Sequence, residues 1–226
     1  MYLKWKEQYI SDFSDENINS LYNQGYIFGR PAKGYMYQSR SLRIDLNKFE
    51  LSSENKRILR KTENLRLTTY DLPLSDYHWS IGRLAKDFYE TKFGKDTFSA
   101  NKIKELLTSE HNFNKLMGFV IPSEAEGSLS EAQNTNNMVG YCIALETDNI
   151  IHYSYPFYNL KSEIKNLGMS MMLNTIIHAK KNDKKYIYLG SAKDAKAKYK
   201  LQFKGLEWFD GEKWSEDLEE LKIILK

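Results

Sequence analysis

The chain has 226 residues and a mass of 26.6 kDa, with 41% hydrophobic, 14% aromatic and 28% charged residues and a formal net charge of +3. This composition supplies a hydrophobic core and excludes wholesale disorder, collagen and a coiled-coil rod. No stretch reaches the roughly 18 apolar residues that a membrane span needs, and the first residues lack a signal peptide's apolar region. We expect a single cytoplasmic domain over residues 1–226, with no membrane partner.

The first predicted elements lie between residues 42 and 107. Residues 42–46 alternate apolar and polar side chains, as a half-buried strand does, and a helix over 55–62 follows the capping residues Ser52 and Ser53. A strand over 66–72 ends at Pro73. Two further helices are predicted, over residues 75–90 and 100–107.

An exposed insertion loop is predicted over residues 123–137, because this stretch is rich in Ser, Glu, Ala, Asn and Gln. Strands over 116–121 and 138–145 flank it. The only cysteine, Cys142, lies in the second strand, so an internal disulfide is excluded and a buried, inert thiol is favoured over a nucleophile. A strand over 150–155 follows a short turn, and in it His152 is either a general base or, as we favour, a structural histidine.

The hydrophobic period changes to that of a helix at Leu167, and a strand over 186–189 follows. A strand, helix and strand in this order form a crossover that joins parallel or splayed strands. A hairpin over 205–214 and a helix over 215–225 complete the chain. The sequence therefore predicts an α+β fold, a mixed sheet with flanking helices.

Charge is unevenly distributed along the chain. Residues 30–66 carry ten Lys/Arg against four Asp/Glu, residues 191–204 carry five lysines against one aspartate, and residues 207–226 carry seven acids against three lysines. Separated basic blocks can form one polyanion-binding surface, although solvated surface charge explains them equally well. The residues Lys56, Arg57, Arg60 and Lys61 fall on one face of the predicted helix 55–62.

Motif searching excludes several kinds of chemistry. The chain has no P-loop, no GxGxxG, no GxSxG and no HExxH, and its four histidines are not spaced as metal pairs on a helix or hairpin. We therefore expect neither a metal nor another cofactor. The helix that opens with Leu167, Gly168, Met169 and Ser170 offers unpaired backbone N–H groups that can hold a phosphate or an oxyanion, although capping alone also explains Gly168.

Several segments together resemble a known family. They are Leu167-Gly168-Met169, Ile176 with Ala179-Lys180, the strand 186–190, the run 198–203 and Glu207, together with a second match over residues 41–64. The element order resembles the GNAT superfamily, and the residues look most like the C-terminal domain of arginyl-tRNA-protein transferases and their bacterial leucyl-transferring relatives. The resemblance implies a GNAT-like fold. The cysteines that the family carries ahead of residue 41 are absent here, and Ala or Lys replaces a usual Met near Lys198.

The resemblance implies transfer of arginine or leucine from charged tRNA to the N-terminal α-amine of a protein that begins with Asp or Glu. No catalytic residue is assigned. The expected site residues are Leu167, Gly168, Met169 and Ser170 for the donor; Arg40, Arg43, Tyr188, Tyr199 and Lys200 for the acceptor; and Lys56, Arg57, Arg60, Lys61, Lys193, Lys196 and Lys198 for tRNA.

Two other functions are kept open. One is an acyl-CoA-dependent GNAT N-acyltransferase, against which the helix opening 165–170 keeps only one glycine. The other is a non-catalytic module that binds nucleic acid or peptide. Binding without turnover of any donor would identify the second.

Overall fold

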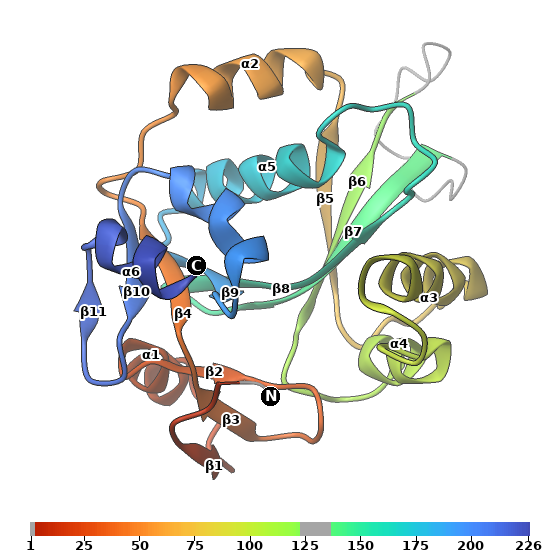
Figure 1. Cartoon of the computed structure of the whole chain (residues 1–226). Coiled ribbons are helices and arrows are strands. Elements are labelled where there is room, and N and C mark those ends of the chain that lie inside the picture. Colours follow the sequence, from red (N-terminus) through yellow and green to blue (C-terminus); the bar gives the residue numbers. More distant parts are fainter. Residues whose placement is uncertain (1–2, 123–136) are drawn as a thin grey trace. The chain divides into compact units, whose positions relative to one another are not determined.

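The computed structural model describes residues 3–122 and 137–226 of the chain (Figure 1). Its residues group into two compact units: unit 1 comprises residues 1–53, 145–154 and 176–226, and unit 2 comprises 54–144 and 155–175. Strand β8 (Ile150–Tyr158) and helix α5 (Leu167–Lys181) run from one unit into the other. The single domain over 1–226 stays a prediction, and the loop expected over 123–137 lies almost wholly outside the described residues.

Unit 1 contains a mixed sheet whose strand order is β11-β10-β4-β9-β8. Its strands are β4 (Ser41–Asp45), β9 (Tyr186–Ser191), β10 (Leu206–Phe209), β11 (Trp214–Ser215) and the first part of β8. The β8–β9 pair is parallel, whereas β4 is antiparallel to both β9 and β10. Because α5 joins β8 to β9, the predicted crossover between parallel strands is confirmed.

The N-terminal part of unit 1 was not predicted from the sequence. It contains a three-stranded antiparallel sheet in the order β1-β3-β2, made of β1 (Glu7–Tyr9), β2 (Tyr26–Phe28) and β3 (Tyr35–Gln38), with helix α1 (Asp15–Asn23) capped by Ser14. These strands have three or four residues each, which is too short for a period to be recognised.

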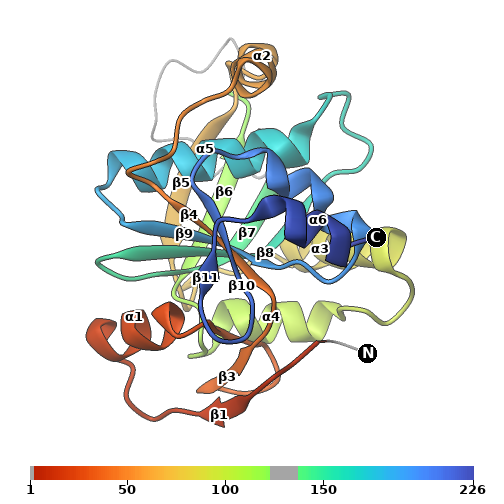
Figure 2. The same ribbon diagram turned by 60° about the vertical axis from the view of Figure 1, so that its left-hand side comes forward.

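The C-terminal part of unit 1 follows the predicted order of elements. A 3-10 helix, η3 (Ala195–Gln202), leads into the β10–β11 hairpin, and helix α6 (Leu218–Ile224) follows with Asp217 as its cap (Figure 2). Asp217 accepts hydrogen bonds from the backbone N–H groups of Glu219 and Glu220, which explains why the helix begins three residues later than expected.

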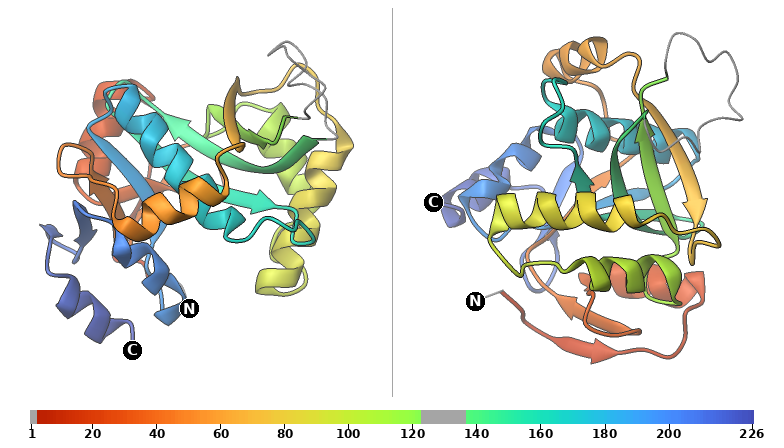
Figure 3. Two further views of the ribbon diagram at one scale, coloured as in Figure 1. Left: turned by 90° about the horizontal axis from the view of Figure 1, so that it is seen from above. Right: turned by 90° about the vertical axis from the view of Figure 1, so that its right-hand side faces the viewer.

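Unit 2 contains an antiparallel meander of β5 (Arg66–Asp71), β6 (Lys115–Val120) and β7 (Met138–Glu146), with the last part of β8 next to β7. Its helices are α2 (Ser53–Lys61), α3 (Trp79–Phe93) and α4 (Ala100–Thr108), and α3 and α4 lie side by side (Figure 3). Helix α3 begins four residues later than predicted because His78 caps it: the His78 side chain accepts from the backbone N–H of Ser80.

The expected fold class, an α+β mixed sheet with flanking helices, is confirmed. The alternation predicted for β4 places Leu42 and Ile44 in the core, each with no exposed surface, and Cys142 is buried as expected. In the part of the chain that the structure describes, no helix is both long enough and apolar enough to cross a bilayer.

Candidate functional site

Arg43, in the middle of β4, lies at the centre of a buried polar cluster in unit 1. Sheet register pairs it with Tyr188 of β9 on one side and Glu207 of β10 on the other. Its Nε donates to Glu207 Oε2 at 2.7 Å, and one terminal nitrogen donates to Asn23 Oδ1 at 2.9 Å and to the Tyr188 hydroxyl at 3.4 Å. Arg43 was predicted to bind the acceptor, but it is 5% exposed, and its Nε and one terminal nitrogen already serve protein groups, so its surroundings are those of a residue in the core of unit 1.

Aromatic rings enclose the same guanidinium from both sides. The Arg43 Cζ lies 3.9 Å from the ring centre of Tyr186 and 4.0 Å from that of Trp214. Tyr188, another predicted acceptor residue, is 1% exposed and packs edge-on against Tyr22 and Trp214. Burial raises the pKa of Tyr188 to about 12, so its hydroxyl stays protonated at neutral pH. The ring is therefore a core element of unit 1.

His152 of β8 is a structural histidine, as favoured above. It is buried, and its Nδ1 lies 2.9 Å from the hydroxyl of Tyr22, which also accepts from the backbone N–H of Phe28. Burial, with a smaller contribution from the Lys200 charge, lowers the pKa of His152 to about 3. The ring is neutral at physiological pH, and its Nδ1 shares a hydrogen bond with the Tyr22 hydroxyl.

Two cations lie at the carboxyl end of β9. Lys200 Nζ donates to the carbonyl oxygen of Leu189 at 2.7 Å and contacts that of Ser191 at 3.5 Å, while an Arg40 terminal nitrogen donates to the carbonyl of Ala192 at 3.4 Å. The Nε of Arg40 is buried without a hydrogen-bond partner. Among the described residues, neither cation forms an ion pair with a carboxylate.

Burial disfavours the charged form of both cations. It lowers the pKa of Lys200 to about 8 and also lowers that of Arg40. Taken as whole residues, both are partly buried rather than enclosed. The predicted acceptor residues thus divide into two groups: Arg40 and Lys200 have donor capacity left, whereas Arg43 and Tyr188 are enclosed.

The short helix η3 presents the remaining predicted residues of unit 1 to solvent. Tyr199 is 49% exposed, and the Lys200 Nζ lies 5.9 Å from its ring centre. The predicted tRNA-binding lysines of this segment are all exposed: Lys193, Lys196 and Lys198. Asp194 caps the helix by accepting from the backbone N–H of Lys196 at 2.9 Å.

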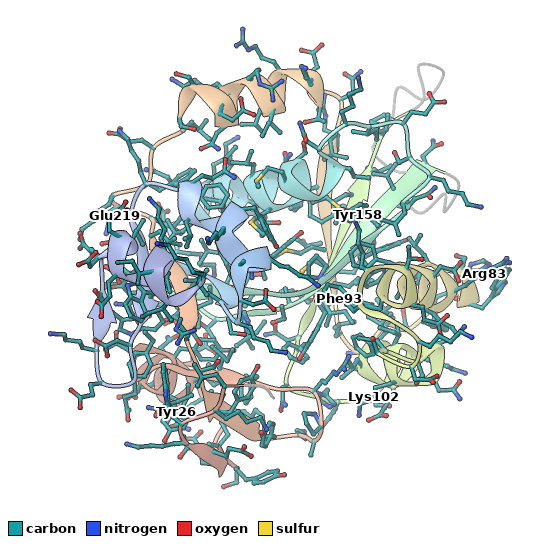
Figure 4. The ribbon with its side chains drawn as sticks, viewed as in Figure 1. Tyr26, Arg83, Phe93, Lys102, Tyr158 and Glu219 are labelled. Atoms are coloured by element: carbon teal, nitrogen blue, oxygen red, sulfur yellow. The ribbon has the colours of Figure 1, made fainter. Side chains whose placement is uncertain are left out.

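The opening of α5, predicted to hold the donor, is closely packed within unit 2. Leu167 and Ser170 are buried, Met169 is half-buried, and the Ser170 hydroxyl accepts from Thr62 Oγ1 at 3.0 Å. A Cβ on Gly168 would lie 2.8 Å from a ring carbon of Tyr158, which Figure 4 labels near the end of β8. Gly168 therefore has a packing reason to be glycine, which the sequence alone did not reveal.

Helix α2 presents its basic residues to solvent, as predicted. Lys56, Arg60 and Lys61 are exposed, whereas Arg57 forms an ion pair with Glu54 at 2.6 Å. Asn55 and Ile58 form the buried side of the helix. A shallow hollow of about 380 Å³ is lined by Lys61 together with Glu163, Ile164 and Lys165.

The described residues contain no group of three His, Cys, Asp or Glu side chains that could hold a metal ion. The polar groups that the structure brings together are the cations, tyrosines and backbone donors described above. Among these, sequence reasoning missed the partners of Arg43. The sequence signal that could have indicated a partner for Arg43 was Glu207, an acid in the hairpin strand that follows the basic residues 191–204.

Comparison with known protein families gives a match over more than half of the chain. The family model described as "Arginine-tRNA-protein transferase, C terminus" matches residues 89–210. A protein of Saccharophagus degradans named "Aspartate/glutamate leucyltransferase" is 24% identical over 211 residues, which cover 88% of this chain and 83% of that protein. A protein of the same name from Xylella fastidiosa is 22% identical over 226 residues, covering 93% and 85% respectively.

Solved structures are more distant. The crystal structure of FemX gives a TM-score of 0.47 at 10% identity, covering 79% of this chain and 60% of that one. The structure of L-PGS from Bacillus licheniformis gives a TM-score of 0.44 at 12% identity, covering 79% and 52%.

Proposed function

Because the chain belongs to the family of the arginine-tRNA-protein transferase C terminus, it is an aminoacyltransferase, and we propose that it transfers leucine from charged tRNA to proteins that begin with Asp or Glu. The observation that carries the proposal is the match to leucyltransferases along most of both chains. The partners are then aminoacyl-tRNA and protein N-termini, and the compartment is the cytoplasm, where charged tRNA is found.

The chemistry asks little of the protein beyond positioning. An aminoacyl-tRNA is an activated ester, so a neutral α-amine held near its carbonyl carbon attacks without a metal or other cofactor. The α-amine has a pKa of about 8, so on the order of a tenth of it is neutral at pH 7. Backbone donors that stabilise the oxyanion supply the remaining assistance.

The donor is assigned to unit 2 in this proposal. The backbone N–H groups that open α5, at Leu167, Gly168 and Met169, face the reactive end, while Ser170 anchors the helix through Thr62. The exposed cations of α2 bind the tRNA backbone, and release of counterions from the phosphates supplies affinity. Three exposed lysines of unit 1 in and just before η3, at 193, 196 and 198, are assigned the same role.

The acceptor is assigned to unit 1. Arg40 and Lys200 have unused donors and no carboxylate partner in the described part of the chain, which suits an acidic N-terminal residue. Tyr199 lines the approach, since it is exposed next to Lys200. Arg43 and Tyr188, which were expected to bind the acceptor, hold the sheet beneath these residues.

A transfer assay tests the proposal directly. The protein is incubated with leucyl-tRNA or arginyl-tRNA and with peptides that begin with Asp, Glu, Asn, Gln or Lys, and the peptide masses are measured. A mass increase of one leucine on the Asp and Glu peptides is expected. Transfer from acetyl-CoA instead, or peptide binding with no transfer from either tRNA, would contradict the proposal.

A further inference from the structure

Within residues 3–122 and 137–226, no carboxylate pairs with the two cations at the carboxyl end of β9. Buried or half-buried cations are normally paired with a carboxylate, because an unpaired charge loses hydration without compensation. Arg43 follows this rule through Glu207. In the described part of the chain, Arg40 and Lys200 do not: their hydrogen bonds go to the backbone carbonyl oxygens of Leu189, Ser191 and Ala192.

The donor geometry at this position leaves room for an anion. An ammonium group has three N–H donors, and at Lys200 only the contact to Leu189 is short. The Nε of Arg40 donates to nothing although it is buried. Gly190, which lies between the two carbonyls that contact Lys200, has no side chain, and the nearest atom to its missing Cβ is Lys200 Nζ at 4.0 Å. The space beside the ammonium is therefore open.

The other titratable groups near Lys200 do not supply negative charge. His152 of β8 faces it and is neutral, because burial lowers its pKa to about 3. Arg40, just before β4, donates to the carbonyl of Ala192 and carries the other positive charge at this end of β9. Burial accordingly disfavours the charged form of Lys200. A carboxylate that enters offsets the cost of burying the charged Lys200, so binding of an anion is favourable here.

We propose that Arg40 and Lys200 form the specificity-determining site that binds the side-chain carboxylate of the acceptor's N-terminal Asp or Glu. This inference rests on the proposed function and names the residues of unit 1 that choose the acceptor. The two cations have different roles. The Arg40 guanidinium binds the carboxylate at any physiological pH, whereas the Lys200 amine binds it only while protonated.

The first test compares matched acceptors. Peptides that begin with Asp and Asn differ only in the charge of the first side chain. The variant Lys200→Met is expected to lower kcat/KM for the Asp peptide by roughly ten- to a hundredfold and to change that for the Asn peptide by less than about threefold. Lys200→Arg keeps the charge and should retain the preference for Asp. Lys213→Met, which removes an exposed charge from the same unit, serves as the control.

The second test needs no variant. Because the pKa of Lys200 is about 8, raising the pH from 7 to 9 should lower the wild-type Asp-to-Asn ratio of kcat/KM by several-fold. Titration of the α-amine affects both peptides and largely cancels in this ratio. In Lys200→Arg, the ratio should not change over the same range, because an arginine stays protonated.

The outcomes separate this inference from the function on which it rests. If the wild-type protein transfers no amino acid to any peptide, the proposed function fails. If it transfers but Lys200→Met and Arg40→Met reduce Asp and Asn acceptance equally, the inference fails alone. A wild-type ratio that is constant from pH 7 to 9 would also overturn the role of Lys200, even if the variants do not fold.

Discussion

Two arginines three residues apart, Arg40 and Arg43, have opposite environments within unit 1. Arg43 has a carboxylate, an amide and two aromatic faces around its guanidinium, and it is 5% exposed. Arg40 is partly buried, contacts one carbonyl and has an unpartnered Nε. Arg43 is paired within the fold, whereas Arg40 keeps donors for a ligand. Substitutions around Arg43 should therefore lower stability, and substitutions at Arg40 and Lys200 should change acceptor selectivity.

The largest expected effect on stability is at Glu207. The variant Glu207→Gln leaves Arg43 buried without a counter-charge, so it should lower the free energy of unfolding by about 3 to 5 kcal/mol. Denaturant unfolding measures this. Glu216→Gln is the matched control, because Glu216 is 65% exposed and pairs with the exposed Lys48. It should cost less than about 1 kcal/mol. If the two variants lost equal free energy of unfolding, the Arg43–Glu207 pair would be no more important to stability than an exposed pair.

A second effect is expected at the opening of α5, where Gly168 lies against the Tyr158 ring. In Gly168→Ala, the new Cβ meets the Tyr158 ring, so the free energy of unfolding should fall by about 1 to 3 kcal/mol. The same substitution in a Tyr158→Ala background should cost much less. This double-mutant cycle shows whether position 168 must be glycine because of packing against Tyr158 or because of contact with the donor. If Gly168→Ala folds normally but loses transfer, donor contact is the better explanation.

A third effect concerns pH and Lys200. Its pKa is about 8 in the folded protein and about 10.4 in an unfolded chain, so between these values the unfolded state binds more protons. Stability contributed by this residue therefore rises as the pH increases from about 8 to 10.4. Relative to Lys200→Met, the wild type should gain about 1 to 2 kcal/mol over this range, after allowance for the partial exposure of the residue. Parallel stability curves would show that its amine is not desolvated.

The smallest effect on stability is expected on the exposed face of α2. Reversing Lys56, Arg60 and Lys61 to Glu should change the free energy of unfolding by less than about 1 kcal/mol while it weakens tRNA binding by at least about tenfold at low salt. Arg57 is retained because it pairs with Glu54. Binding is measured by titration at two salt concentrations, with Lys213→Glu as the charge control. Unchanged affinity would remove α2 from the tRNA surface.

Local sequence patterns predicted most elements between residues 42 and 225. The alternation in β4, the capped basic helix α2 and the apolar stripe of α5 each depend on neighbouring residues, so a period reveals them. The sheet of β1, β2 and β3 was missed, because strands this short are defined by their pairing. The start of α3 was placed four residues early for a similar reason: several residues could cap it, and the structure selects His78.

Residue types by themselves determined that this protein is cation-rich in separate blocks, lacks disulfide and P-loop chemistry, and carries its family's characteristic segments around α5 and β9. Only the tertiary structure decided which of those residues are free to act. Sheet register brings Glu207 against Arg43 from 164 positions along the chain, whereas Arg40 and Lys200 have no such partner among the residues that the structure describes. Charge is a local property of the sequence, whereas pairing depends on residues that only folding brings together.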